Sequence, residues 1–138
     1  MQAINYRRVV LGGLLACVVL LAGEIAIIGS MHKVIMAARD AAKMPPSTPN
    51  PVLGVIELLL TGFFLIWLYA AMRPRFGAGA MTAVRSGAAA WFALGLIVTL
   101  HMVNDNFGLP AYLLVAIGAG MLPCFVAASL AGGWIYRE

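Results

Sequence analysis

The chain has 138 residues, of which 63% are hydrophobic and 10% are charged, with a formal net charge of +4. Soluble domains carry about half apolar and about a quarter charged residues, so this balance excludes an ordinary soluble domain and indicates a membrane protein. The length suffices for four membrane spans of about 20 residues each and leaves no room for a soluble module. We expect membrane lipids as partners and no nucleic acid.

Four apolar stretches are long enough to cross a hydrocarbon core of about 30 Å as helices. They run from Val9 to Gly29, from Val52 to Met72, from Val84 to Val103 and from Ala111 to Tyr136. The sequence therefore predicts one all-helical domain over residues 1–138, an integral membrane four-helix bundle.

Capping and helix-breaking residues mark the ends of these spans. Asn50 before Pro51 predicts a capped second helix, and Pro74 predicts its end just after Arg73. Thr82 is a candidate cap for the third helix, and Pro110 opens the fourth. Between the first two spans, residues 31–44 are compatible with a continued or surface-lying helix, which must break at the proline-rich residues 45–49.

Positive charge predicts the orientation. One side of the predicted bundle holds six cations and the other holds three. The six are Arg7, Arg8, Arg73, Arg75, Arg85 and Arg137, and the three are Lys33, Arg39 and Lys43. Cytoplasmic loops carry the excess of Lys and Arg, so we expect both termini in the cytoplasm.

Two glutamates stand inside the spans. Glu24 lies five residues before Gly29, and Glu57 lies five residues after Val52. Each is therefore about 8 Å inside the outer boundary at the rise of a helix. Intramembrane carboxylates are costly and are candidates for function.

Other titratable side chains reach a similar depth. His101 and Asp105 lie at the outer end of the third span, and His32 lies above the first. Together with the two glutamates, they predict a polar layer in the outer third of the bundle.

Several chemistries are compatible with this layer. Two acids sharing a desolvated site suit proton binding or relay. Two Glu with a His suit a divalent metal, although neither glutamate has a His three residues on, as helical di-metal sites do. His101 or His32 is also a candidate ligand for a haem or chlorophyll. Glu24 is also compatible with a structural role, bonded to Ser30, Asn104 or a backbone carbonyl. The sequence identifies no metal site and no cofactor.

The last span carries a stripe of small residues every four positions, which lets another helix approach closely. The stripe consists of Ala116, Gly120, Cys124, Ala128 and Gly132. Its occupant is either a helix of this chain or a helix of another subunit.

Five segments of the chain are distinctive: Gly23-Glu24, residues 68–77, residues 82–85, Trp91-Phe92 and residues 133–138. Together they resemble an uncharacterised family of small bacterial four-span membrane proteins. The most specific is Tyr-Ala-Ala-x-Arg-Pro-Arg-Phe-Gly. The resemblance implies the four-helix fold and the bacterial cytoplasmic membrane, and it implies no catalytic residues. Arg73, Arg75 and Arg85 flank the stretch Phe76-Gly77-Ala78-Gly79. They predict a cationic cytoplasmic turn that binds lipid headgroups or an acidic protein surface.

These features favour a non-enzymatic membrane protein that is an accessory or assembly subunit of a larger membrane complex. Its expected partners are other membrane protein subunits or further copies of the same chain. The alternative is a small proton-coupled transporter or ion-handling protein that uses Glu24 and Glu57. An enzyme is the least favoured class, because no nucleophile is paired with a base.

The orientation is testable by accessibility. Reporter fusions at Glu138 and cysteine labels in the turn from Arg73 to Arg85 should report the cytoplasm, because six cations lie on that side. A cysteine at Ser47 should react with an impermeant maleimide from outside. Labelling of Ser47 only from inside would contradict the predicted orientation.

Overall fold

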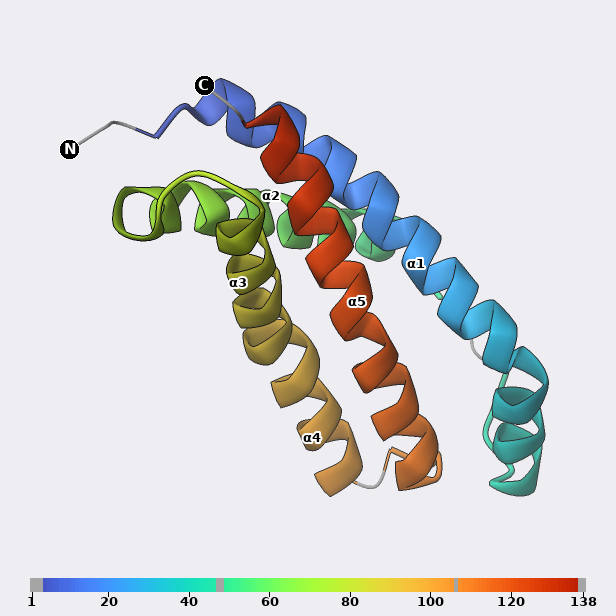
Figure 1. Ribbon diagram of the computed structural model, residues 1–138. Coiled ribbons are helices and arrows are strands. Elements are labelled where there is room, and N and C mark those ends of the chain that lie inside the picture. Colours follow the sequence, from blue (N-terminus) through green and yellow to red (C-terminus); the bar gives the residue numbers. More distant parts are fainter. Residues whose placement is uncertain (1–3, 47–48, 106, 137–138) are drawn as a thin grey trace.

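The computed structural model describes residues 4–46, 49–105 and 107–136. Within these ranges the chain is all-helical, and four helices are long and apolar enough to cross a membrane, which confirms the predicted fold class. In chain order they are α1 (Tyr6–Ala41), α2 (Pro51–Phe76), a third helix composed of α3 (Ala80–Ala90), the π-helical turn η1 (Trp91–Leu96) and α4 (Ile97–Asn104), and α5 (Ala111–Ile135), as Figure 1 shows.

Two helix starts agree with the predicted boundaries. The side chain of Asn50 accepts hydrogen bonds from the amides of Val52 and Leu53, at 3.0 and 3.3 Å. Pro51 follows at the first position of α2, where a missing N–H costs nothing. Pro110 immediately precedes α5.

Two other predicted boundaries are wrong. Helix α2 continues through Pro74 to Phe76, because a proline in the last turn disturbs only a bond near the helix end. The third helix begins at Ala80, with Gly79 at the cap position. Thr82 therefore does not cap α3, and its hydroxyl instead donates to the carbonyls of Phe76 and Gly77 at the end of α2, at 3.3 and 2.8 Å.

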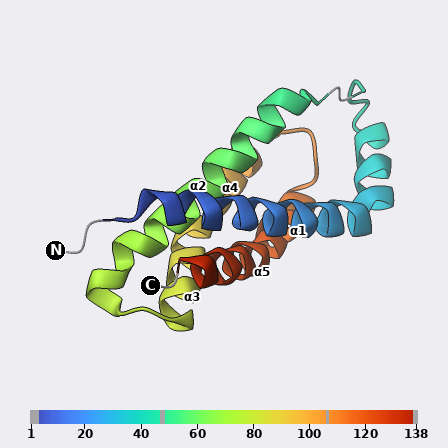
Figure 2. The same cartoon turned by 90° about the horizontal axis from the view of Figure 1, so that it is seen from above.

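Helix α1 continues beyond its predicted span to Ala41. A continued helix is one of the two forms expected for residues 31–44. At 36 residues α1 is about 54 Å long, well beyond the hydrocarbon thickness. Figure 2 shows its last third turning away from the axis of the first part. The sequence explains the turn, since Gly29 is followed by Ser30, whose hydroxyl donates to the Ile27 carbonyl at 2.8 Å.

Helix α5 is the centre of the packing. It contacts α1 on one side and α3, η1 and α4 on the other, whereas α2 packs against α1 and α3 and touches α5 more sparsely. The buried core lies in the half of the molecule that holds both termini, which we call the closed half. Its core residues are Val9, Ala16, Leu20, Leu65, Ile66, Tyr69, Ala70, Ala83, Ala90, Phe125, Ala128 and Tyr136.

The two ends of the described chain are joined in the closed half. The Asn5 amide donates to the Tyr136 hydroxyl at 3.0 Å. The Tyr136 ring meets the Tyr69 ring edge to face, with centroids 6.1 Å apart. These contacts fix the ends of α1, α2 and α5 at one level.

The small-residue stripe of α5 is occupied by α1 of the same chain. A Cβ built on Gly132 would lie 2.5 Å from the Gly12 carbonyl oxygen, so the two backbones touch. Further along, Gly23 faces the Cys124 side chain, and Gly120 faces Ile27.

The other two stripe residues differ from each other. Ala128 is fully buried, whereas Ala116 is exposed. Of the two possible occupants, the structure thus assigns an internal helix to the stripe from Gly120 to Gly132.

Replacing Gly132 by Leu should destabilise the monomer. The added side chain would meet the Ile66 side chain and the backbone oxygen of Gly12, and the backbone oxygen cannot swing aside. We therefore expect a loss of about 3 kcal/mol, the upper range for overpacked cores. Thermal unfolding of the purified protein in mild detergent measures this loss.

Ala116→Leu is the matched control, because it adds a large side chain to the same stripe where α1 does not cover it. It should change stability by less than about 0.5 kcal/mol. Equal losses in both variants would mean that α1 does not occupy the stripe as described.

Candidate functional site

The structure brings Glu24 and Glu57 together. Glu24 lies on α1 shortly before its bend, and Glu57 lies two turns into α2. Both line one cavity of about 140 Å³ between α1, α2 and α5, and the two carboxylates are close enough to interact electrostatically. The other lining residues are Leu20, Gly54, Leu58, Thr61, Met121 and Phe125.

Neither carboxylate has a hydrogen-bond donor or an ion-pair partner among the described residues. The donors considered for Glu24 are used elsewhere: the Ser30 hydroxyl bonds to Ile27, and the Asn104 amide lies 3.3 Å from Asp105 Oδ1. Both glutamates are exposed at the protein surface. The structure therefore contains two adjacent acids whose hydrogen-bonding capacity the described chain does not fill.

The predicted polar layer does not extend to His101 and Asp105. His101 Nε2 lies 3.1 Å from Asp105 Oδ2 on the next turn of the same helix, and the two side chains are 73% and 51% exposed. Neither residue lines the glutamate cavity. Equal depth in the membrane is therefore not enough to bring these side chains to the glutamates, because His101 and Asp105 lie on a helix that does not contact α1.

His32 also lies apart from the glutamates. It is an exposed residue in the last third of α1, beyond the bend, and it does not line their cavity. In the described ranges, no three His, Cys, Asp or Glu side chains gather in a way that would hold a metal ion.

A wide apolar groove adjoins the glutamate cavity. It has a volume of about 590 Å³ and shares Glu57 and Thr61 with that cavity. Its remaining lining consists of Leu53, Ile56, Leu60, Phe64 and Leu94. In the parts of the chain that the structure describes, α2 packs closely against α3 but not against η1 or α4.

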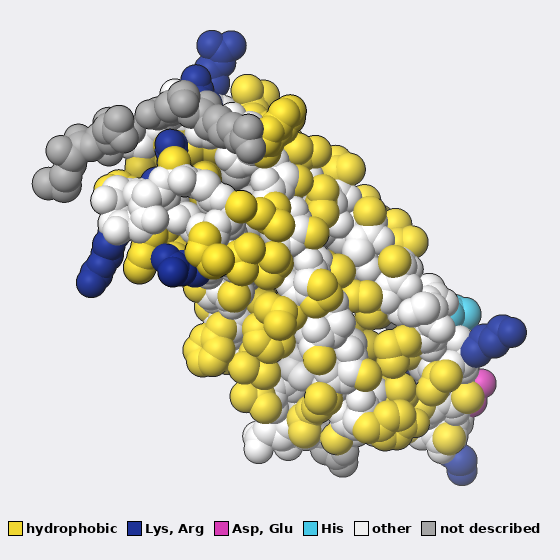
Figure 3. Space-filling view, in the orientation of Figure 1, with side chains coloured by type: hydrophobic (Ala, Val, Ile, Leu, Met, Phe, Trp, Pro, Cys, Tyr) yellow, Lys and Arg dark blue, Asp and Glu magenta, His cyan; other side chains and the backbone are white. Residues whose placement is uncertain are grey.

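The first part of α2 therefore diverges from the third helix, and we call this side of the molecule the open half. Figure 2 shows α2 crossing the view obliquely. The space-filling view in Figure 3 shows hydrophobic side chains over most of the molecule's long face, with the charged side chains gathered at its two ends.

The third helix is held on α5 by polar contacts that were not predicted from the sequence. The hydroxyls of Ser86 and Ser129 are 2.7 Å apart and fully buried. The Trp91 indole N–H donates to the Gly118 carbonyl at 2.8 Å. Serines inside apolar spans are a detectable signal for such contacts, since membrane helices use small polar residues to associate.

The π-helical turn begins at Trp91. The Trp91 ring lies over Gly95, and the Gly95 carbonyl accepts a hydrogen bond from the Thr99 hydroxyl at 2.7 Å. This turn lies beside the apolar groove, to which it contributes Leu94. It thus forms the wall of the groove opposite α2.

The arginines of the predicted cationic turn lie in the closed half, away from the glutamates. The guanidinium carbons of Arg75 and Arg85 lie 5.9 and 5.2 Å from the centre of the Phe76 ring. Arg73 instead contacts Tyr136, with its guanidinium carbon 5.3 Å from that ring centre. The three therefore form no ion pair with Glu24 or Glu57.

The chain matches no protein-family model, no curated protein and no solved structure. The function of the glutamate cavity is therefore argued from its geometry.

Replacing Glu57 by Gln should stabilise the isolated protein. The change removes the repulsion between two like charges that no described cation offsets, and exposed charge pairs of this kind are worth up to about 1 kcal/mol. The midpoint of thermal unfolding at neutral pH in detergent measures the effect.

Asp105→Asn is the control, and we expect no gain in stability from it. It also replaces an exposed acid by its amide, but it removes the contact with His101 and should leave stability unchanged or lower. A Glu57→Gln protein that is less stable than the unmodified protein would show that the carboxylate has a stabilising partner.

Proposed function

We propose that this multi-pass membrane protein is a non-enzymatic subunit of a larger membrane assembly, and that its open half docks a transmembrane helix of the partner. The observation that carries the proposal is the pair of carboxylates, Glu24 and Glu57, without a donor from the described chain. In the protein without its partner, these acids would face lipid, where an unpaired charge is costly. A partner helix that supplies a hydrogen-bond donor or a cation removes this cost.

The groove beside the acids fits the same occupant. Its walls, α2 and η1, present apolar side chains such as Leu53, Leu60 and Leu94 to the gap. Lipid chains also fill apolar gaps, but they satisfy no carboxylate. A helix with apolar residues on one face and a polar or basic residue at the depth of Glu57 matches both features.

A different polypeptide fits better than a second copy of this chain. Between Arg8 and Lys33, between Pro51 and Arg73, and between Arg85 and Arg137 the sequence contains no Lys or Arg. A second copy therefore brings no lysine or arginine to the depth of the acids. The small-residue stripe, which is the other candidate for an intermolecular surface, is already covered by α1 from Gly120 to Gly132.

Proton-coupled transport is the alternative function. Two acids on one cavity of about 140 Å³ are a reasonable proton site, and the site opens on the groove. The same two residues would carry either function, so the two proposals are separated by experiment.

We also propose the bacterial cytoplasmic membrane as the location, with both termini in the cytoplasm. The family resemblance supports the location. The concentration of arginines at the end that holds the termini supports the orientation. In this orientation the glutamates lie in the half of the membrane farther from the cytoplasm.

Photocrosslinking in native membranes tests the docking proposal. A photoreactive residue at Leu53, which is 62% exposed in the open half, should crosslink to a distinct polypeptide. The matched control is Val18, which is 63% exposed on α1 outside the groove and should crosslink to lipid alone. The double variant Glu24→Gln, Glu57→Gln should lower the yield at Leu53 about tenfold or more, because it removes charge-assisted hydrogen bonds.

Three outcomes decide between the functions. Equal polypeptide yield at Leu53 with and without the Gln substitutions would contradict docking through the acids. A yield at Leu53 no higher than at Val18 would contradict docking in the groove. Normal assembly of the double Gln variant together with loss of pH-driven flux in proteoliposomes would favour transport instead.

A further inference from the structure

The closed half contains a second cavity, which shares no lining residue with the glutamate cavity. Its volume is about 350 Å³, and it lies between the end of α2, the turn that leads into α3, and the end of α5. It is lined by Tyr69, Arg73, Ala78, Gly79, Ala80, Ala83, Leu130, Gly133 and Trp134. Arg73 is the only charged residue in this lining.

Arg73 is held in place but has few hydrogen bonds. Its guanidinium lies over the Tyr136 ring, and its Nη1 donates to the Tyr136 carbonyl over 3.5 Å. Its Nε is buried without a hydrogen-bond partner in the described chain. A guanidinium has five N–H donors, and the described residues accept one of them over a long distance. Because Arg73 lines the cavity, a group with several acceptor oxygens there would reach the Nη donors of its guanidinium.

The backbone at the same cavity also presents donors. Gly79 precedes α3 and provides no side-chain cap, and the Thr82 hydroxyl bonds instead to Phe76 and Gly77. A Cβ built on Gly79 would meet no atom within 4 Å, so the space beside it is open. The first amides of a helix have no intrahelical acceptor and carry a partial positive charge.

Among the described residues, the charge around the cavity is of one sign. The described arginines of the closed half are Arg7, Arg8, Arg73, Arg75 and Arg85. The described carboxylates lie elsewhere, with Glu24 and Glu57 on the glutamate cavity and Asp40 and Asp105 at helix ends next to the opposite loops. Figure 3 shows dark blue side chains at the end that holds the termini and magenta only at the opposite end of the visible face.

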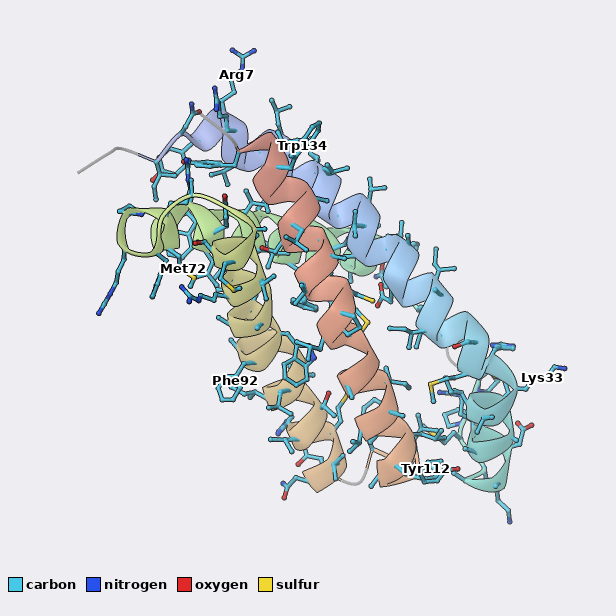
Figure 4. All side chains as sticks on the ribbon, in the orientation of Figure 1. Arg7, Lys33, Met72, Phe92, Tyr112 and Trp134 are labelled. Carbon is cyan, nitrogen blue, oxygen red and sulfur yellow. The ribbon has the colours of Figure 1, made fainter. Side chains whose placement is uncertain are left out.

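The aromatic lining places the cavity at headgroup depth. Trp134 lies at the end of α5 beside the N-terminal part of α1, and Figure 4 shows it at the same end of the molecule as Arg7, far from Lys33 and Tyr112. Tryptophan and tyrosine are enriched where membrane meets water. Lipid phosphates lie at this level.

We propose that this cavity binds the phosphate group of an anionic ligand, with Arg73 as its main contact and the first amides of α3 as additional donors. Phosphate oxygens match a guanidinium better than a single-point acceptor does, because two parallel N–H···O bonds form. The site uses none of the residues of the glutamate cavity and does not depend on the docking proposal.

Binding by the purified full-length protein tests the site. Native mass spectrometry and thermal shift are recorded in a neutral detergent with three probes: phosphatidylglycerol, phosphatidylcholine and inorganic phosphate. We expect phosphatidylglycerol to bind at least about tenfold more tightly than phosphatidylcholine, because only the former carries net negative charge. Binding of inorganic phosphate alone, with no preference for the lipid, would identify the ligand as a soluble phosphate compound.

Three variants separate a built site from general attraction to cations. Arg73→Gln should weaken binding about tenfold, as expected for loss of charge-assisted hydrogen bonds. Arg75→Gln removes the same charge from the same segment but does not line the cavity, and it should weaken binding less than about twofold. Ala80→Leu keeps every charge and fills the cavity, so it should weaken binding even if Arg73→Gln fails to fold.

Two results would overturn the proposal. One is an equal loss in Arg73→Gln and Arg75→Gln together with unchanged binding in Ala80→Leu, which would indicate diffuse attraction. The other is the absence of binding by both phosphatidylglycerol and inorganic phosphate.

Discussion

The contact between the backbones of α1 and α5 at Gly12 and Gly132 is the constraint on which the rest of the structure depends. Lipid is as apolar as a leucine side chain, so membrane helices associate through close packing rather than through hydrophobic burial. Two facing glycines allow the closest approach, and a Cβ on either would meet the other's carbonyl oxygen. This contact aligns α1 and α5 in opposite directions and places the chain ends together.

The packing on α5 explains why one half of the molecule is open. One side of α5 holds α1 through the small-residue stripe, and the other holds the third helix through Ser86 with Ser129 and Trp91 with Gly118. Little of α5 remains for α2, which packs mainly on α1 and α3. The first turns of α2 consequently stand away from η1 and carry Glu57 into a gap.

Charge follows the same division. The closed half combines arginines, aromatic rings and a cavity without a described carboxylate, which suits an anionic group at the membrane surface. The open half combines two carboxylates with apolar walls, which suits a partner inside the membrane. One chain thus has two surfaces of opposite charge at different depths in the membrane. Neither surface has a group of complementary charge among the described residues.

The sequence was sufficient for the number of spans, their order and the proximity of Glu24 and Glu57. Hydropathy and residue counts determine depth, and these two residues share both depth and a pair of adjacent helices. His101 shares the depth alone. Its direction around the helix axis depends on how the third helix packs on α5, which includes a π-helical turn that hydropathy does not indicate.

The stripe on α5 shows the same limit. Its residues predicted a close contact, but the complementary glycines of α1, Gly12 and Gly23, are spaced irregularly and form no equivalent pattern. The occupant became evident only from the structure. Likewise, threonine is a common helix-capping residue, but the hydroxyl of Thr82 donates to the carbonyls of Phe76 and Gly77 in the turn before α3.

Distances between spin labels test the division into halves most directly. In a protein with Cys17 and Cys124 replaced by Ala, labels at Trp67 and Met81 span α2 and α3 in the closed half, and labels at Val52 and Ile97 span α2 and α4 in the open half. All four positions are exposed, so labels should not disturb the core. We expect a narrow, short distribution for the closed pair and a longer, broader one for the open pair in the isolated protein in lipid nanodiscs. An open pair as short and narrow as the closed pair would show that α2 lies against the third helix along its whole length, and would contradict the open half.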